Sequence, residues 1–235
     1  QTVVDRVEQM QRIADENARA IGEWAEVGYQ EYRSSKLLQQ QLTQSGFTVD
    51  AGVAAMPTAF VATSGAGKPV IAFLAEFDAL PGLSQTSKPQ RERLAGHSAG
   101  HACGHNLLGT GAVLGAVAAA DWLKSARRAG TVRVYGTPAE EGGGGKVYLV
   151  RAGLFDDVDA VMNWHPDSFN ASMTLPNLAM IQSRFQFYGV ASHASVAPEL
   201  GRSALDGIEA MDMMVNMMRE HVPPTARIHY AITAT

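Results

Sequence analysis

The sequence is poor in cysteine, in charge of either sign and in long apolar runs, and each shortage excludes a class of protein. Its 235 residues include one cysteine, Cys103, which cannot form a disulfide within the chain. Charged residues make up 18% of the chain and the formal net charge is -4. Because Lys and Arg are scattered, no basic stripe can neutralise the phosphates of nucleic acid or of anionic lipid. We therefore predict no nucleic-acid partner and no membrane partner.

The longest apolar stretch, residues 107–120, is rich in Gly and Ala and shorter than the roughly 20 residues that a membrane-spanning helix needs. It predicts a buried helix. Hydrophobic residues make up 46% of the chain, a share typical of a globular protein and too high for a disordered one. The chain opens at Gln1 and no signal peptide is recognisable. A cytoplasmic location is expected, with a periplasmic or secreted one as the alternative if a signal peptide was removed before Gln1.

Predicted strands and helices alternate along the first 181 residues, which indicates an α/β fold. Several predicted strands, such as residues 70–77, are apolar throughout, as expected for strands buried on both faces. The sequence therefore predicts a mostly parallel sheet covered by helices on both faces. Helices are predicted at 3–26, 34–44, from 105 onward and at 146–152, and strands at 47–49, 59–62, 70–77, 131–135 and 160–164.

The pattern changes near residue 181. Residues 182–188 alternate apolar and polar side chains, residues 201–221 have helical spacing, and residues 228–232 alternate again. This β-α-β order predicts the beginning of a second, open-faced α+β domain. We assign residues 1–181 to the first domain and 182–235 to an incomplete second one.

A cysteine and a histidine lie two residues apart at the start of a predicted helix. Gly104 allows a tight turn between Cys103 and His105. Thiolate and imidazole are both good ligands for zinc, and a helix N-terminus favours the deprotonated thiol. A buried structural cysteine beside a helix-capping histidine would produce the same pair.

Further candidate ligands stand where three predicted strands end. Carboxyl ends of parallel strands meet at one edge of a sheet, so side chains there should converge. The adjacent carboxylates of Glu140 and Glu141 would repel each other unless a cation neutralised them. The sequence therefore predicts a metal site at this edge. The residues near the three strand ends are Glu76, Asp78, Glu140, Glu141 and His165.

Four segments resemble the aminoacylase and carboxypeptidase G-type metallopeptidases and amidohydrolases. They are GHACGHNLLGT (100–110), YGTPAEEGGGGK (135–146), NWHP (163–166) and SHASVAPELGRSALDG (192–207), in the family's order. The resemblance implies a metallopeptidase-like catalytic domain followed by a lid or dimerisation domain. It also implies one or two divalent ions, Zn or Mn, with four ligands, namely Cys103, His105, Glu141 and His165.

The same resemblance implies metal-dependent hydrolysis of an amide bond in an N-acyl amino acid or dipeptide, for example an aromatic acyl-glutamate. One or two cations would polarise the amide carbonyl and acidify a water molecule. Glu140 is implied as the general base that takes the water's proton and later delivers it to the leaving amine. Asp78 is implied as a carboxylate that orients the ligands. His101, four residues before His105, is expected to support a ligand, because glycines interrupt the helix that would make it one.

One implied residue of the active site lies in the second domain. In the resembling family a histidine at the position of His193 reaches the active site of a neighbouring subunit and stabilises the oxyanion. This implies a homodimer through the lid domain, or a related sister subunit in the partner's place. A surface histidine that caps a turn is the alternative for His193. Ser203 stands where relatives often carry an Asn that binds the substrate carboxylate, so Arg202 is a candidate substitute.

Two other functions remain open. A catalytically incomplete fragment or non-catalytic subunit is one, because the second domain stops midway and the family's last metal-binding histidine would fall beyond Thr235. A serine hydrolase is the other, because residues 96–100 read GHSAG and place Ser98 in a G-x-S-x-G pattern. That motif needs a strand directly before it, whereas residues 87–93 are typical of a loop.

Overall fold

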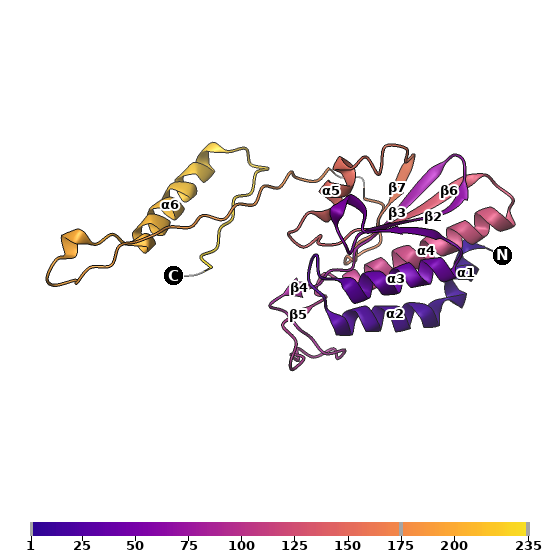
Figure 1. Ribbon diagram of the computed structural model, residues 1–235, viewed down its shortest axis with the longest axis horizontal. Coiled ribbons are helices and arrows are strands. Elements are labelled where there is room, and N and C mark those ends of the chain that lie inside the picture. Colours follow the sequence, from indigo (N-terminus) through magenta and orange to yellow (C-terminus); the bar gives the residue numbers. More distant parts are fainter. Residues whose placement is uncertain (1, 174–175, 234–235) are drawn as a thin grey trace. The chain divides into compact units, whose positions relative to one another are not determined.

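The computed structural model describes residues 2–173 and 176–233 (Figure 1). The chain forms two compact units, Gln1–Phe169 and Asn170–Thr235, and each is described by itself.

The first unit is built on a mixed five-stranded sheet, so the prediction of an α/β fold is confirmed and that of a mostly parallel sheet is wrong. β3 pairs in parallel with both β6 and β7, whereas β2 is antiparallel to both β1 and β6. The connection from β1 to β2 is short, and short connections join antiparallel strands. The sheet order is β1 (Thr48–Ala51), β2 (Phe60–Ala66), β6 (Gly130–Gly136), β3 (Val70–Ala75) and β7 (Ala160–Met162).

Four helices lie on one side of this sheet (Figure 1). α4 contacts β2, β3 and β6, α3 contacts β1 and β2, and α1 and α2 pack against α4. The helix predicted at 3–26 is broken at Met10, whose N–H bonds back to Val7 O and whose side chain is buried. These helices are α1 (Val3–Gln9), α2 (Gln11–Trp24), α3 (Tyr32–Gln44) and α4 (His105–Ser125).

α4 is long and apolar enough to cross a bilayer by length and composition. It lies in the protein core instead, because Leu108, Val113 and Val117 are buried. At Gly109 a Cβ would lie 2.3 Å from Glu76 O. The absence of a side chain there lets the first turns of α4 approach the end of β3, and that approach brings His105 to the carboxylates that follow β3.

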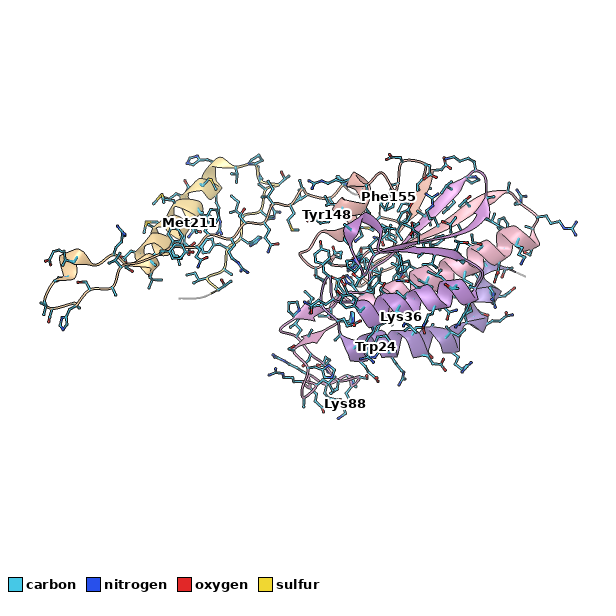
Figure 2. The ribbon with its side chains drawn as sticks, in the orientation of Figure 1. Trp24, Lys36, Lys88, Tyr148, Phe155 and Met211 are labelled. Atoms are coloured by element: carbon cyan, nitrogen blue, oxygen red, sulfur yellow. The ribbon has the colours of Figure 1, made fainter. Side chains whose placement is uncertain are left out.

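The other face of the sheet has a smaller cover. It comes from α5 (Gly145–Arg151) and the turn that follows it. Tyr135 of β6 stacks on Phe155 with ring centroids 4.1 Å apart, and Arg133 pairs with Asp157. Figure 2 shows Phe155 on the opposite side of the sheet from Lys36 of α3. Within the described part of the first unit, helical cover is therefore unequal, because α5 on this face is much shorter than α2, α3 and α4 on the other.

In the second unit the predicted helix forms and the two predicted strands do not. α6 (Ala204–Met218) is capped by Ser203, whose Oγ accepts from Asp206 N at 3.1 Å. Residues 182–188 and 228–232 carry no strand in the described part of this unit. Alternation specifies which side chains share a face, but a strand forms only where a neighbouring strand supplies backbone hydrogen bonds.

Candidate metal centre

The candidate site lies where the carboxyl ends of β3 and β6 meet the start of α4 (Figure 1). His105 is the first residue of α4 and is 1% exposed. Gly104 before it has φ +83°, a left-handed conformation that favours glycine. This turn lets α4 begin with an inward-facing imidazole.

His105 is surrounded by acidic groups. Its Nδ1 lies 3.0 Å from both Asp78 Oδ1 and Asp78 O. Its Nε2 faces three carboxylate oxygens, from Glu76 at 3.2 Å, Glu140 at 3.8 Å and Glu141 at 3.9 Å. When Nδ1 donates to Asp78, the lone pair of Nε2 points at these carboxylates, and this tautomer is the one that binds a metal through Nε2.

Asp78 joins the start of α4 to the turn that follows β6. It is fully buried, and its second oxygen accepts from Glu141 N at 2.9 Å. Burial alone would raise the pKa of Asp78, but the hydrogen bonds from His105 and from the Glu141 N–H lower it overall. Asp78 is therefore an anion at neutral pH. Its contacts are those expected of a residue that orients His105 and Glu141.

Cys103 and His165 meet on the outer side of the cluster, with Sγ 3.1 Å from His165 Nε2. The segment before His165 is fixed by Trp164, whose ring packs on Gly111 of α4 and whose Nε1 donates to Leu108 O at 3.1 Å. The ligand atoms of Cys103, His105 and Glu141 lie within 4.8 Å of one another, as do those of a second, overlapping group of Glu76, His105 and Glu140.

The pKa of the Cys103 thiol differs from the sequence-based expectation. Burial, followed by the charge of Glu141, raises the pKa of Cys103 to about 11. The prediction of a thiolate favoured by the helix N-terminus is therefore wrong for the protein without a cation. The reason is that burial, together with the nearby carboxylates, outweighs the partial positive charge of the helix end.

The cluster fits a divalent ion. Within the described residues, His105 Nε2 and Glu141 Oε1 are buried without a hydrogen-bond partner. Buried polar atoms that lack a partner destabilise a protein unless something satisfies them. A divalent cation would contact both atoms, and a donor set of thiol, imidazole and carboxylate suits zinc or manganese.

Sequence reasoning missed Glu31, which holds the turn carrying Glu140 and Glu141. Glu31 is fully buried; its Oε1 accepts from Ala139 N at 2.8 Å and its Oε2 from Thr58 Oγ1 at 2.9 Å. Ala139 has φ +55°, so this turn begins in a conformation that alanine disfavours. Nothing in the local sequence distinguishes Glu31 from an exposed carboxylate at the start of a helix.

We expect Glu31→Ala to lower the free energy of unfolding by about 3 kcal/mol, because the Ala139 N–H and the Thr58 hydroxyl lose their buried acceptor. Glu8→Ala, at an exposed site in α1, is the control and should change it by less than about 0.5 kcal/mol. Urea denaturation of both variants measures the difference. Equal stability of the two variants would contradict the role of Glu31.

The structure places His101 outside the cluster. Its Nε2 lies 3.2 Å from Ile21 O in α2, and burial lowers the pKa of His101 to about 4, so the ring is neutral. His101 lines a cavity of about 1000 Å³ between α2, the 82–100 loop and the start of α4, and the metal-ligand candidates do not line it. None of the hydrogen bonds of His101 within the described residues reaches a candidate ligand. No contact therefore supports the expected role of His101 in orienting a metal ligand.

Ser98 does not form a nucleophile elbow. It lies in a loop, where its backbone O accepts from Gly82 N. The two-residue strand β5 (Ala99–Gly100), paired with β4 (Leu80–Pro81), follows it, and α4 begins only at His105. The elbow requires a strand directly before the serine and a helix directly after it. The serine-hydrolase interpretation is therefore wrong.

His193 and Arg202 belong to the second unit. His193 Nδ1 accepts from Ser195 N at 3.3 Å, as in the alternative of a histidine that caps a turn. Arg202 exchanges two backbone hydrogen bonds with Val190. Their implied roles in oxyanion and carboxylate binding stay predictions.

Comparison with known proteins identifies relatives along most of the chain. Residues 72–229 match the model of Peptidase family M20/M25/M40. The chain is 45% identical to one of the subunits of p-aminobenzoyl-glutamate hydrolase from Escherichia coli (strain K12), over 97% of this chain and 48% of that protein. It is 36% identical to Xaa-Arg dipeptidase of Mus musculus, over 90% of this chain and 48% of that protein. The chain thus spans about half the length of these relatives.

Two solved structures resemble this fold. The YXEP protein of Bacillus subtilis, a dinuclear metal binding peptidase from the M20 family, matches with a TM-score of 0.53 and 27% identity, over 68% of this chain and 44% of that one. A putative aminohydrolase from methicillin resistant Staphylococcus aureus matches with a TM-score of 0.65 over 95% of this chain and 58% of that one. At 22% identity, the second likeness concerns the fold alone.

Proposed function

The chain belongs to peptidase family M20/M25/M40, a family of metallopeptidases and amidohydrolases, and on that premise we propose that it hydrolyses an amide bond in an N-acyl amino acid or dipeptide. The observation that carries the proposal is the convergence of Cys103, His105 and Glu141, whose ligand atoms lie within 4.8 Å of one another. His165 joins them through its contact with Cys103. These four residues are the proposed ligands of one or two divalent ions, Zn or Mn, and the dinuclear Bacillus structure supports a two-ion site.

When bound, the ion supplies Lewis acidity that polarises the amide carbonyl and acidifies a water molecule. Glu140 is the proposed base. Its carboxylate is partly exposed, with Oε2 3.8 Å from His105 Nε2. Burial, followed by the charge of Glu76, raises the pKa of Glu140. A raised pKa makes this carboxylate a stronger proton acceptor, and the proton it takes can then be donated to the leaving amine.

The names of two relatives support the substrate class. One is a component of a hydrolase of p-aminobenzoyl-glutamate and the other is a dipeptidase. Both substrates carry an amide bond next to an amino acid, so we propose an aromatic acyl-glutamate or a dipeptide here. In this proposal residues 182–235 begin a lid or dimerisation domain. His193 and Arg202 then bind the oxyanion and the substrate carboxylate at the site of a neighbouring protomer, either a second copy of this chain or a related sister protein.

Metal removal tests this function in the whole protein. Dialysis against a chelator should abolish hydrolysis of acyl-glutamates and dipeptides, and zinc or manganese should restore it, because the cluster has no other source of Lewis acidity. A matched sample carried through dialysis without chelator is the control. Full activity after the metal has been removed would overturn the proposal.

A non-catalytic component of a larger enzyme is the second candidate, and the observation in its favour is that the Escherichia coli relative is named as one subunit of a hydrolase. The whole protein, purified alone and loaded with metal, separates the two functions. Turnover by the isolated protein supports the enzyme. Metal binding without turnover, followed by activity when a sister protein is added, supports the second candidate.

Metal affinity should rise with pH. The pKa of the Cys103 thiol is raised to about 11, so at pH 6 to 8 the thiol is protonated and must lose its proton when it binds a metal. Release of one proton makes the affinity about tenfold higher for each added pH unit. Chelator competition between pH 6 and 8 measures the slope. In Cys103→Ser the slope of log affinity against pH should fall by about one decade per pH unit. An unchanged slope in that variant would exclude the thiol as a ligand.

A further inference from the structure

A lysine and a buried glutamate form an ion pair at the edge of the proposed metal site. Glu76, which follows β3, is 4% exposed. One of its oxygens pairs with Lys146 Nζ, and the other lies 3.2 Å from His105 Nε2. A single carboxylate thus connects an ammonium group to the imidazole nitrogen that faces the cluster.

The backbone next to Lys146 fixes the position of this lysine beside Glu76. Lys146 is the second residue of α5, and a Cβ on Gly145 before it would lie 2.0 Å from Pro138 O. Only glycine permits that approach, which brings the start of α5 against the end of β6. The glycines before Lys146 therefore allow the turn that carries Glu140 and Glu141, and they also place Lys146 next to Glu76.

The charge of Lys146 opposes the proposed function of the site. An ammonium group close to a divalent ion repels it, and the repulsion is strong where burial lowers the effective dielectric constant. A cation at this position therefore weakens metal binding. Lys146 also neutralises Glu76, and a buried carboxylate without a partner would destabilise the protein before any metal binds.

Lys146 pairs with one oxygen of Glu76 and offsets its negative charge, so loss of the lysine would make the other oxygen, which faces His105 Nε2, a stronger ligand for a metal ion. A ligand oxygen of Glu76 lies within 4.8 Å of ligand atoms of His105 and Glu140, a spacing that a metal ion can bridge. An additional anionic ligand would bind the ion more tightly and reduce its positive charge. Reduced charge on the ion weakens the polarisation of the substrate carbonyl.

We propose that Lys146 is a positioning residue that holds Glu76 as a counter-charge instead of a metal ligand, so that the ion binds less tightly and stays more electrophilic. The inference rests on the proposed metal-dependent function. A merely structural ion pair predicts the opposite effect on metal binding, because its loss would loosen the site.

The test is Lys146→Met in the whole protein, with zinc affinity measured by competition with a chromophoric chelator. We expect about tenfold tighter zinc binding, a lower Tm of the metal-free protein and a lower kcat with zinc at saturation. Lys146→Arg should retain the affinity of the unmodified protein. Lys68→Met is the matched control, because Lys68 pairs with Asp159 beside the opposite end of β3 and its loss should leave zinc affinity unchanged.

Glu76→Gln tests the same pair from the other side. It should weaken zinc binding about tenfold, because Lys146 then repels the ion without a counter-charge, and the double variant should return to within about threefold of the unmodified protein. Unchanged or weaker zinc binding by Lys146→Met, or a double variant that binds zinc as tightly as Lys146→Met alone, would overturn the inference. Absence of zinc binding by the unmodified protein would instead overturn the proposed function, and this inference with it.

Discussion

Glu140→Gln is expected to lower kcat by about 10²- to 10⁴-fold while zinc affinity stays within a few-fold of that of the unmodified protein. The amide has nearly the same size as the carboxylate but cannot accept the proton of a water molecule. Glu140 is the more exposed of the two adjacent glutamates and is not one of the proposed ligands, although one of its oxygens lies in the second, overlapping group with Glu76 and His105. Turnover should therefore fall without loss of the metal.

Two further variants make this experiment specific. Glu141→Gln, one residue away, should lose zinc affinity first, because Glu141 Oε1 is one of the two buried atoms of the cluster that lack a hydrogen-bond partner. Glu92→Gln, in the exposed 82–100 loop, should change neither quantity. The measurements are kcat with saturating zinc and zinc content after gel filtration. Activity of Glu140→Gln within a few-fold of normal would exclude Glu140 as the base.

Cys103→Ser is expected to weaken zinc binding by roughly 100-fold or more, since loss of residues that merely support a ligand already costs about 10- to 100-fold. A hydroxyl keeps the size of the side chain but is far harder to deprotonate than a thiol, so it is a poor ligand at neutral pH. Stability of the metal-free protein should change little, because the thiol is partly exposed.

The single cysteine of the chain provides an independent readout. Zinc at saturation should protect the thiol from alkylation, and removal of zinc should restore its reactivity. If His105→Ala loses this protection, Cys103 and His105 bind the same zinc ion, as proposed. Equal alkylation rates with and without zinc, together with normal zinc affinity in Cys103→Ser, would exclude the sulfur from the site.

The elements of the first unit were predictable from its sequence because they depend on local patterns. Apolar residues at helical spacing predict α3, and the uninterrupted apolar run of β3 predicts a buried strand. The order of the strands was not predictable. β6 lies between β2 and β3, so these two strands, which follow one another along the chain, are separated in the sheet. Which strands pair depends on contacts between residues far apart in the sequence.

The convergence of Cys103, His105, Glu141 and His165 was also foreseen, because strand ends and a helix start were expected at one edge of the sheet. His101 was expected to support this group and instead lies against α2. Sequence spacing places a residue on an element, but it does not say which way a loop turns the side chain.

The sequence by itself determined the α/β class of the first unit and the family to which the chain belongs, and it predicted the residues that are proposed to bind the metal. The tertiary structure alone decided that Glu31 supports the turn of Glu140 and Glu141, that Lys146 pairs with Glu76, and that burial and nearby carboxylates raise the pKa of Cys103. The physical reason is that motifs and periodicity are properties of neighbouring residues. Burial, charge pairing and pKa depend on the distance between groups that only the folded chain brings together.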